Sequence, residues 1–148
     1  MKNYLLITLL CLFTLTNCSL GGDNNIDEQQ TVRVLWQLEN VSGGIEGVDN
    51  DFDPNVVVWE FDEVNANLTV ENNNATTSLE DGLNTGTYSY YLEPGNTDEE
   101  AYLIIDTTEF GRITVTSSTL VIDQNFTTNG NAADGYIYTF SKQIIVEN

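Results

Sequence analysis

Acidic side chains at alternating positions are the first candidates for chemistry in this sequence. Asp49, Asp51 and Asp53 alternate with other residues, and such carboxylates can converge on Ca²⁺, a hard cation that takes about six to eight oxygen ligands. Glu60 stands where a calcium loop has its last ligand, but Pro54 occupies the position at which that loop needs glycine for its turn. Two interpretations therefore stay open: a calcium site, or an acidic, solvated loop that leads into a strand.

Adjacent acidic residues raise the question of glycoside hydrolysis. Such pairs occur at Asp62-Glu63, Glu80-Asp81 and Asp98-Glu99. The reaction needs two carboxyl groups about 5–9 Å apart across a cleft, whereas neighbours on a strand point to opposite faces. The sequence also has no histidine, so serine triads and histidine-dependent metal sites are absent. We therefore expect a protein that is not an enzyme and that holds no cofactor.

Aromatic residues could instead line a binding cavity, because tyrosine combines an apolar ring with a polar tip. Trp59, Tyr90 and Tyr102 are the lining residues that strand alternation favours. Packing of the same rings in a core is the alternative. A ligand site would require an interior void of about 300 Å³, the lower end for ligand pockets.

Composition limits the classes of partner. The 148 residues include 23 Asp and Glu but only four Lys and Arg, a formal net charge of −19. The length suits one domain of roughly 100–150 residues, and the 41% hydrophobic content suffices for a core. Phosphate binding needs clustered basic side chains, which this sequence lacks, so nucleic acid is excluded as a partner.

The first residues have the organisation of a secretion signal. Lys2 precedes an apolar run, Leu5–Leu15, that is too short to cross a membrane as a helix. Cys18 follows, and Ser-Leu-Gly-Gly comes directly after it. This arrangement resembles a bacterial lipoprotein signal, with Asn17 where such signals usually have Gly or Ala. The resemblance implies a signal peptide over residues 1–17 and lipidation of Cys18; ordinary secretion is the alternative.

Lipidation would anchor the protein in the cell envelope through Cys18. Two or more acyl chains give stable membrane attachment, and residues 18–30 would then form the flexible tether of a domain at residues 31–148. Cleavage removes Lys2 and Cys11, which leaves three basic against 23 acidic residues, a net charge of −20. That charge repels anionic lipid surfaces, so the domain should stand away from the bilayer. Ser19 is compatible with sorting to the outer membrane.

From Thr31 onward the pattern predicts β-strands almost throughout. Val32, Val34, Trp36 and Leu38 recur at every second position, and the residues between them include the polar Arg33, Gln37 and Glu39, the period of a strand with one buried face. Similar runs follow, separated by turn signals rich in Gly, Asn, Asp and Pro. The predicted strands are 31–39, 55–62, 67–71, 86–92, 102–106, 112–116, 119–123 and 135–142.

Eight short strands without a helix predict an all-β domain. Hairpin-length connections favour an antiparallel up-and-down order, and closure into a barrel removes the free sheet edges. The interior of an eight-stranded barrel is either filled by side chains or holds one small ligand. A β-sandwich is the alternative, with residues 71–85 and 125–134 as the longer connections it would need.

The order of these segments resembles the lipocalin-like domain of small Bacteroidetes (flavobacterial) lipoproteins. The segments that carry the resemblance lie within residues 31–142 and include Leu35-Trp36-Gln37-Leu38, Val58-Trp59-Glu60-Phe61 and Gly86-Thr87-Tyr88-Ser89-Tyr90. The resemblance implies an eight-stranded lipocalin-like barrel that binds small apolar molecules. It also implies that Trp36 lies at the barrel base and that Lys142 packs across it, a cation–π contact of about 0.5–2 kcal/mol. Val34, where the family has glycine, departs from the pattern.

Two hypotheses about function follow. In the first, the barrel is a membrane-anchored module that binds a small apolar ligand at its open end. In the second, the barrel is filled and acts as a structural or interaction protein, whose acidic surface binds or inhibits a basic protein partner.

Overall fold

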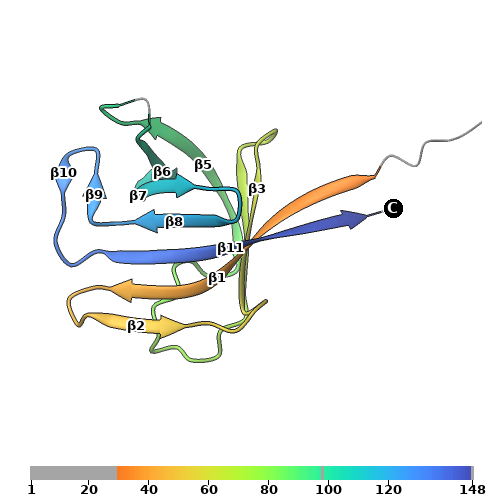
Figure 1. The fold of residues 1–148 in the computed structure, drawn as a ribbon, viewed down its shortest axis with the longest axis horizontal. Helices are drawn as coiled ribbons and strands as arrows, with labels where there is room; N and C mark the ends of the chain where they lie inside the picture. The colour runs from red at the N-terminus through yellow and green to blue at the C-terminus, as the bar shows by residue number, and fades with distance from the viewer. Residues whose placement is uncertain (1–29, 98, 148) are drawn as a thin grey trace, which may run out of the picture.

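The computed structural model describes residues 30–97 and 99–147 of the chain, and every regular element in them is a β-strand (Figure 1). Eight of these strands form the body of the domain. Their bounds are β1 Thr31–Gly43, β3 Val57–Asp62, β4 Asn67–Asn72, β5 Gly86–Pro94, β6 Ala101–Ile105, β7 Thr108–Val115, β8 Thr119–Asp123 and β11 Tyr136–Glu147.

The eight strands close into an antiparallel barrel in chain order. Each strand pairs with the next one, and β11 returns to pair with β1 along almost the full length of both. This closure leaves the body of the sheet without the free edges that invite association with other chains. The predicted all-β, eight-stranded up-and-down barrel is thereby confirmed, and the alternative β-sandwich is not observed.

Three short strands were not predicted. β2, Val48–Asp51, pairs with the second half of β1, and β9, Phe126–Thr127, forms a small hairpin with β10, Gly130–Asn131. The sequence of β2 is Val-Asp-Asn-Asp, and Asp and Asn are depleted in strands. Pairing with β1 therefore overrides the local preference of this segment.

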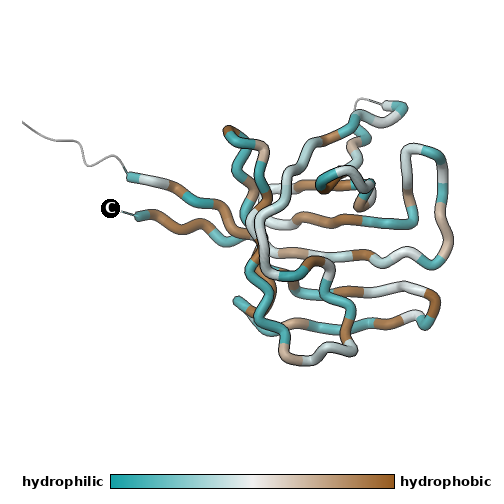
Figure 2. The backbone as a smooth tube through the Cα atoms, turned by 180° about the vertical axis from the view of Figure 1, so that it is seen from behind, coloured by the Kyte–Doolittle hydropathy of each residue, from teal (hydrophilic) through white to brown (hydrophobic). Residues whose placement is uncertain are grey.

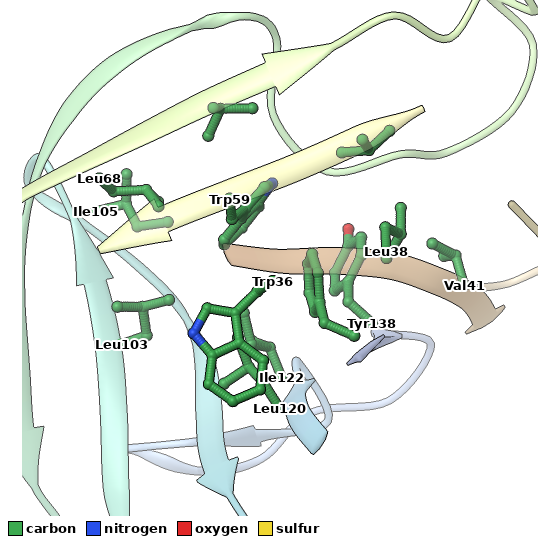
Figure 3. Packing of buried hydrophobic residues seen from close by; sticks show 13 residues of the cluster. Trp36, Leu38, Val41, Trp59, Leu68, Leu103, Ile105, Leu120, Ile122 and Tyr138 are labelled. Carbon is green, nitrogen blue, oxygen red and sulfur yellow. The ribbon is translucent and has the colours of Figure 1, made fainter. Parts of the chain in front are cut away.

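The barrel interior is filled by side chains that alternate inward along each strand (Figure 3). Trp59 is fully buried at its centre, with its ring centroid 4.9 Å from that of Phe140 and 5.6 Å from that of Phe110. Its indole nitrogen has no hydrogen-bond partner within the described part of the chain, which costs of the order of 1–3 kcal/mol. The close packing of aromatic rings around Trp59 offsets this cost.

One end of the barrel is covered by the connection between β4 and β5, residues 73–85. Gly82, at a φ of +88°, brings the backbone so close that a Cβ there would lie 3.4 Å from both Trp59 and Tyr138. The Tyr138 hydroxyl donates a 2.9 Å hydrogen bond to Glu80 Oε1. We call residues 79–83 the plug, because they pack directly on the core and close this end.

A two-stranded ribbon projects from the opposite end (Figures 1 and 2). β1 pairs with β3 only from Leu35 to Gln37, and β11 pairs with β8 only up to Ser141. Beyond these points Thr31–Val34 and Ile144–Glu147 pair only with each other. We call these eight residues the ribbon. Much of its β11 arm has the hydrophobic colour in Figure 2.

Candidate binding site

A half-open apolar pocket lies at the ribbon end of the barrel. Its volume is about 150 Å³, and its lining comes from five strands and one turn. The lining residues are Trp36, Phe61, Glu63, Tyr90, Leu92, Ile113, Val115 and Leu120. Most of them belong to the inward-facing set that fills the barrel, or pack against it, at the positions where the strands reach the rim.

The aromatic wall of the pocket is built by β3 and β5. The rings of Phe61 and Tyr90 meet edge to face with centroids 5.0 Å apart. In this arrangement the positive edge of one ring meets the negative face of the other, which is favourable. Burial and the nearby carboxylates of Glu63 and Asp62 raise the pKa of the Tyr90 hydroxyl. The hydroxyl therefore stays neutral at physiological pH and remains a hydrogen-bond donor at the pocket.

Two charged side chains adjoin the pocket itself. Glu63 is the one charged side chain that lines the pocket. Lys142 Nζ lies 5.8 Å from the centroid of the Trp36 ring, which is the pairing implied by the family resemblance and falls within cation–π range. Trp36 therefore lies between the Lys142 ammonium group and the pocket, and only 7% of its surface is exposed to solvent.

An ion pair fixes the base of the ribbon on the outer side. Arg33 donates hydrogen bonds of 2.8 and 2.6 Å to both carboxylate oxygens of Glu60 and one of 3.2 Å to Glu147. These bonds raise the pKa of Arg33 and hold the pKa of Glu60 below its ordinary value. Arg33 thus links the first strand to β3 and to the last strand.

A groove of about 660 Å³ continues outward from the pocket. It runs between the β1 arm of the ribbon and the turn that joins β3 to β4, and Phe61 and Glu63 line both hollows. Val32, Val34 and Val64 give the groove apolar surface. The pocket and the groove therefore lie next to each other on the ribbon side, with Phe61 and Glu63 between them.

The volume of the pocket decides what it can enclose. Ligand pockets in proteins span about 300–1,000 Å³, and the rim pocket has about half of the lower figure. A cavity of this size, with apolar walls, holds one benzene ring in other proteins. The interior void of about 300 Å³ that an enclosed ligand would require is therefore not found in the described barrel, whose interior is filled by side chains. The rim pocket can bury only one ring or a short stretch of hydrocarbon, and the rest of a larger ligand would lie outside the barrel.

The three aromatic residues expected to line a cavity lie in three different places. Tyr90 lines the rim pocket. Trp59 is buried in the middle of the packed core. Tyr102 is buried too, but it alternates with Leu103 and Ile105, which belong to the core, so it lies on the other face of β6. Leu92 and Val115, absent from the prediction, complete the rim.

The acidic loop considered as a calcium site forms part of the extra strand. Asp49 and Asp51 both accept hydrogen bonds from Asn40 Nδ2, at 2.8 and 2.9 Å. Asp53 follows the strand, and its backbone oxygen accepts a hydrogen bond from Val56. Within the described ranges, 30–97 and 99–147, no three acidic, histidine or cysteine side chains are grouped so that they could hold a metal ion.

A second, polar hollow of about 450 Å³ lies beside the plug. Its amide and carboxylate groups bond to one another: Asn74 Nδ2 donates to Asp81 at 2.8 Å, and Asn72 Nδ2 donates to the Leu83 carbonyl at 2.9 Å. These groups hold the loop in place, so the rim pocket is the stronger binding candidate.

The proposed lipidation site, Cys18, lies outside the described residues. In the residues that are described there is no helix of sufficient length and apolarity to cross a membrane.

The chain was compared with protein-family models, with curated proteins and with solved structures. No family model, no curated protein and no solved structure matches it.

Proposed function

We propose that this protein is a lipid-anchored binding module of the bacterial cell envelope, at the outer membrane, which binds a small apolar group at the rim of its barrel. The observation that carries the proposal is the rim pocket, an apolar hollow on an otherwise solid barrel. Its walls bring together Trp36, Phe61, Tyr90 and Leu120 around about 150 Å³. Catalysis is not part of the proposal, because the sequence has no histidine.

Burial of apolar surface supplies the affinity. Each square ångström removed from water contributes about 25 cal/mol, and the exposed rim residues Leu92 and Val115 are 51% and 57% accessible before anything binds. Binding therefore removes from water both the apolar surface of the ligand and the exposed apolar surface of the rim. The deeper wall residues, such as Phe61 and Tyr90, are already packed against the core, so little ordering of their side chains opposes binding.

The proposed anchor places the pocket toward the membrane. β1 begins at Thr31, at the tip of the ribbon, so a tether from Cys18 would reach the barrel at its pocket end. Twelve residues, 19–30, span at most about 40 Å when fully extended. The tip of the ribbon would then lie within that distance of the lipid surface, where apolar ligands are concentrated, and the pocket would lie about 16 Å further along the strand.

Titration with toluene, observed by methyl NMR, tests the binding site. Toluene is neutral and matches the size of the pocket. We expect saturable shifts of the methyl groups of Leu92, Ile113, Val115 and Leu120, with none at Val57 in the deep core. Val115→Phe should fill the rim and weaken binding about tenfold or more.

Ile45→Phe is the matched control, because Ile45 is 83% exposed and does not line the pocket. It should bind toluene as the unchanged protein does. Shifts that do not saturate, or that survive Val115→Phe unchanged, would refute a site at the rim.

A second function is favoured by the uncompensated acidic surface. Among the described residues, Glu60 and Glu147 are the acidic side chains that form ion pairs, and both pair with Arg33. Most of the negative charge is therefore free to attract a basic protein, and attraction of this kind weakens as salt rises. Partners captured from envelope extracts at low salt and lost at high salt would support this function over the first.

A further inference from the structure

We propose that the ribbon and the rim pocket form one continuous track for the hydrocarbon chain of a cationic amphiphile. This inference rests on the proposed binding function and specifies its ligand: the chain end enters the rim pocket, the chain lies along the ribbon, and a positively charged head group lies over the groove.

The ribbon carries the inner face of the barrel out past the rim. Val32 and Val34 have the same strand parity as Trp36, and Ile144 and Val146 have the same parity as Lys142. In the register of the two strands Val32 lies opposite Val146, and Val34 lies opposite Ile144. The strand face that points into the core inside the barrel thus continues outside it as four apolar side chains.

Three of these four side chains are open to solvent, and the fourth, Val34, is partly buried against the core. Val32, Ile144 and Val146 are 60%, 59% and 53% exposed. An isolated two-stranded ribbon is only marginally stable in water, and contiguous exposed apolar surface commonly marks an interaction site. A bound hydrocarbon chain would cover this face and join it to the pocket.

The dimensions suit a chain of moderate length. From Trp36 to Val32 is four residues of strand, or about 13 Å. The pocket at the inner end adds room for one ring or a short stretch of chain, as described above. Val64, 93% exposed on the facing turn, gives the chain an apolar neighbour on its other side.

Charge selects the head group. The groove contains Arg33, Glu60, Asp62 and Glu63. Arg33 and Glu60 neutralise each other, whereas Asp62 and Glu63 have no ion-pair partner among the residues described. Asp62 is held ionised, since hydrogen bonds from Asn65 lower its pKa. The groove is therefore net negative and favours a cationic head.

Two described cations adjoin the track: Arg33, which is paired with Glu60 and Glu147 at the groove, and Lys142. Lys142 is the one of these two without an ion-pair partner among the described residues. It lies at the inner end, against Trp36, while the head group of the amphiphile lies at the outer end. Lys142 does not line the groove, whereas Asp62 and Glu63 do, so a head group over the groove meets these carboxylates directly. The carboxylates of the groove are the nearer charges.

The test compares three amphiphiles with the same twelve-carbon chain and different heads, each below its micelle-forming concentration. Calorimetry should give the order dodecyltrimethylammonium, then dodecyl maltoside, then dodecanoate, with about tenfold between first and last. The double variant Asp62→Asn/Glu63→Gln should remove the preference for the cation. The matched control, Glu46→Gln/Asp134→Asn, changes two acids outside the groove and should keep it.

A second pair of variants tests the ribbon without changing the pocket. Val32→Thr/Ile144→Thr keeps β-branched residues and should weaken all three twelve-carbon ligands several-fold, while toluene binding stays unchanged. Ile45→Thr should change neither.

The outcomes separate this inference from the proposed function. Dodecanoate that binds as tightly as the ammonium compound would overturn the charge assignment. Chain affinity that does not respond to the ribbon variants, with toluene still bound, would overturn the track and leave the rim pocket. If the unchanged protein binds the twelve-carbon ligands but not toluene, the rim pocket is overturned as a binding site instead.

Discussion

At the scale of single residues, the Arg33 side chain connects three strands of the barrel. It joins Glu60 through two hydrogen bonds and Glu147 through a third, so one guanidinium ties the first strand, the third and the last. The planar fork of arginine matches a carboxylate in this bidentate way. Side-chain exposures of 40% for Arg33 and 27% for Glu60 keep the stabilisation modest.

The variant Glu60→Gln should lower the free energy of unfolding by about 0.5–1 kcal/mol at neutral pH. Arg33 lowers the pKa of Glu60 from its ordinary 4.5, so the folded state favours the carboxylate. The stabilisation is complete above that ordinary pKa and is lost as the pH falls through the lower folded-state value. Urea denaturation at neutral pH and at about pH 3 should therefore show the difference between the two proteins shrinking in acid.

Glu93→Gln is the control for this prediction, because it removes an exposed carboxylate that forms no ion pair in the described part of the chain. A loss as large as that of Glu60→Gln would mean that charge removal in general, and not the pair with Arg33, is responsible.

At the scale of elements, the plug and the ribbon give the two ends of the barrel opposite characters. The plug seals one end with backbone packed directly on Trp59 and Tyr138. The ribbon leaves the other end with an apolar face and a hollow. Burial raises the pKa of the Tyr138 hydroxyl above the ordinary value for tyrosine, and the nearby Glu80 carboxylate raises it further. The hydroxyl therefore stays protonated and remains a hydrogen-bond donor to the plug.

Tyr138→Phe should lower the free energy of unfolding by about 1.5–3 kcal/mol, the usual value for a hydrogen bond to a charged group. Tyr88→Phe is the matched control, because its hydroxyl donates to the Asn84 carbonyl at 2.9 Å on the exposed surface. It should cost about 0.5–1.5 kcal/mol. Denaturant unfolding measures both, and equal losses would show that Glu80 does not hold the plug.

At the scale of the whole molecule, charge and anchor act in opposite directions. A formal net charge of −19 repels anionic lipid, whereas acyl chains on Cys18 would hold the protein at the membrane. The barrel itself gives no electrostatic attraction to anionic lipid, because its described basic residues are Arg33, Arg112 and Lys142 alone. Arg112 stacks on the Phe126 ring at 3.5 Å.

Cys18→Ser should therefore release the protein from the membrane completely. Expression in a bacterial host with a labelled fatty acid should show label in the unchanged protein and none in the variant. The variant should also fail to sediment with vesicles that contain anionic lipid. Variant protein that still sediments would show that the barrel itself, and not the lipid, holds the membrane.

Strand alternation predicted the barrel well because most strands have one buried face. It failed for β2, where pairing with β1 overrides a sequence of Asp and Asn. It also could not orient Tyr102, since Tyr102 to Ile105 are all buried and the run has no polar position to mark a face.

The site was predicted only in part for a similar reason. Tyr90 and Trp59 share the inward parity, but parity does not give depth along the barrel, so one lies at the rim and the other in the core. The contact of Lys142 with Trp36 followed from the family resemblance. Leu92 and Val115 gave no signal, because the place at which neighbouring strands end depends on their register.

The pairing of β1 with β11 also constrains the order in which the domain can fold. Thr31 lies opposite Glu147 and Gly43 lies opposite Tyr136, so the seam of the barrel joins residues about a hundred positions apart and carries a large loop-closure entropy. During synthesis β1 emerges first and must wait for the last strand, with its edge unpaired along the ribbon. The unfolded chain is therefore open to strand exchange with other chains until β11 is available to pair with β1.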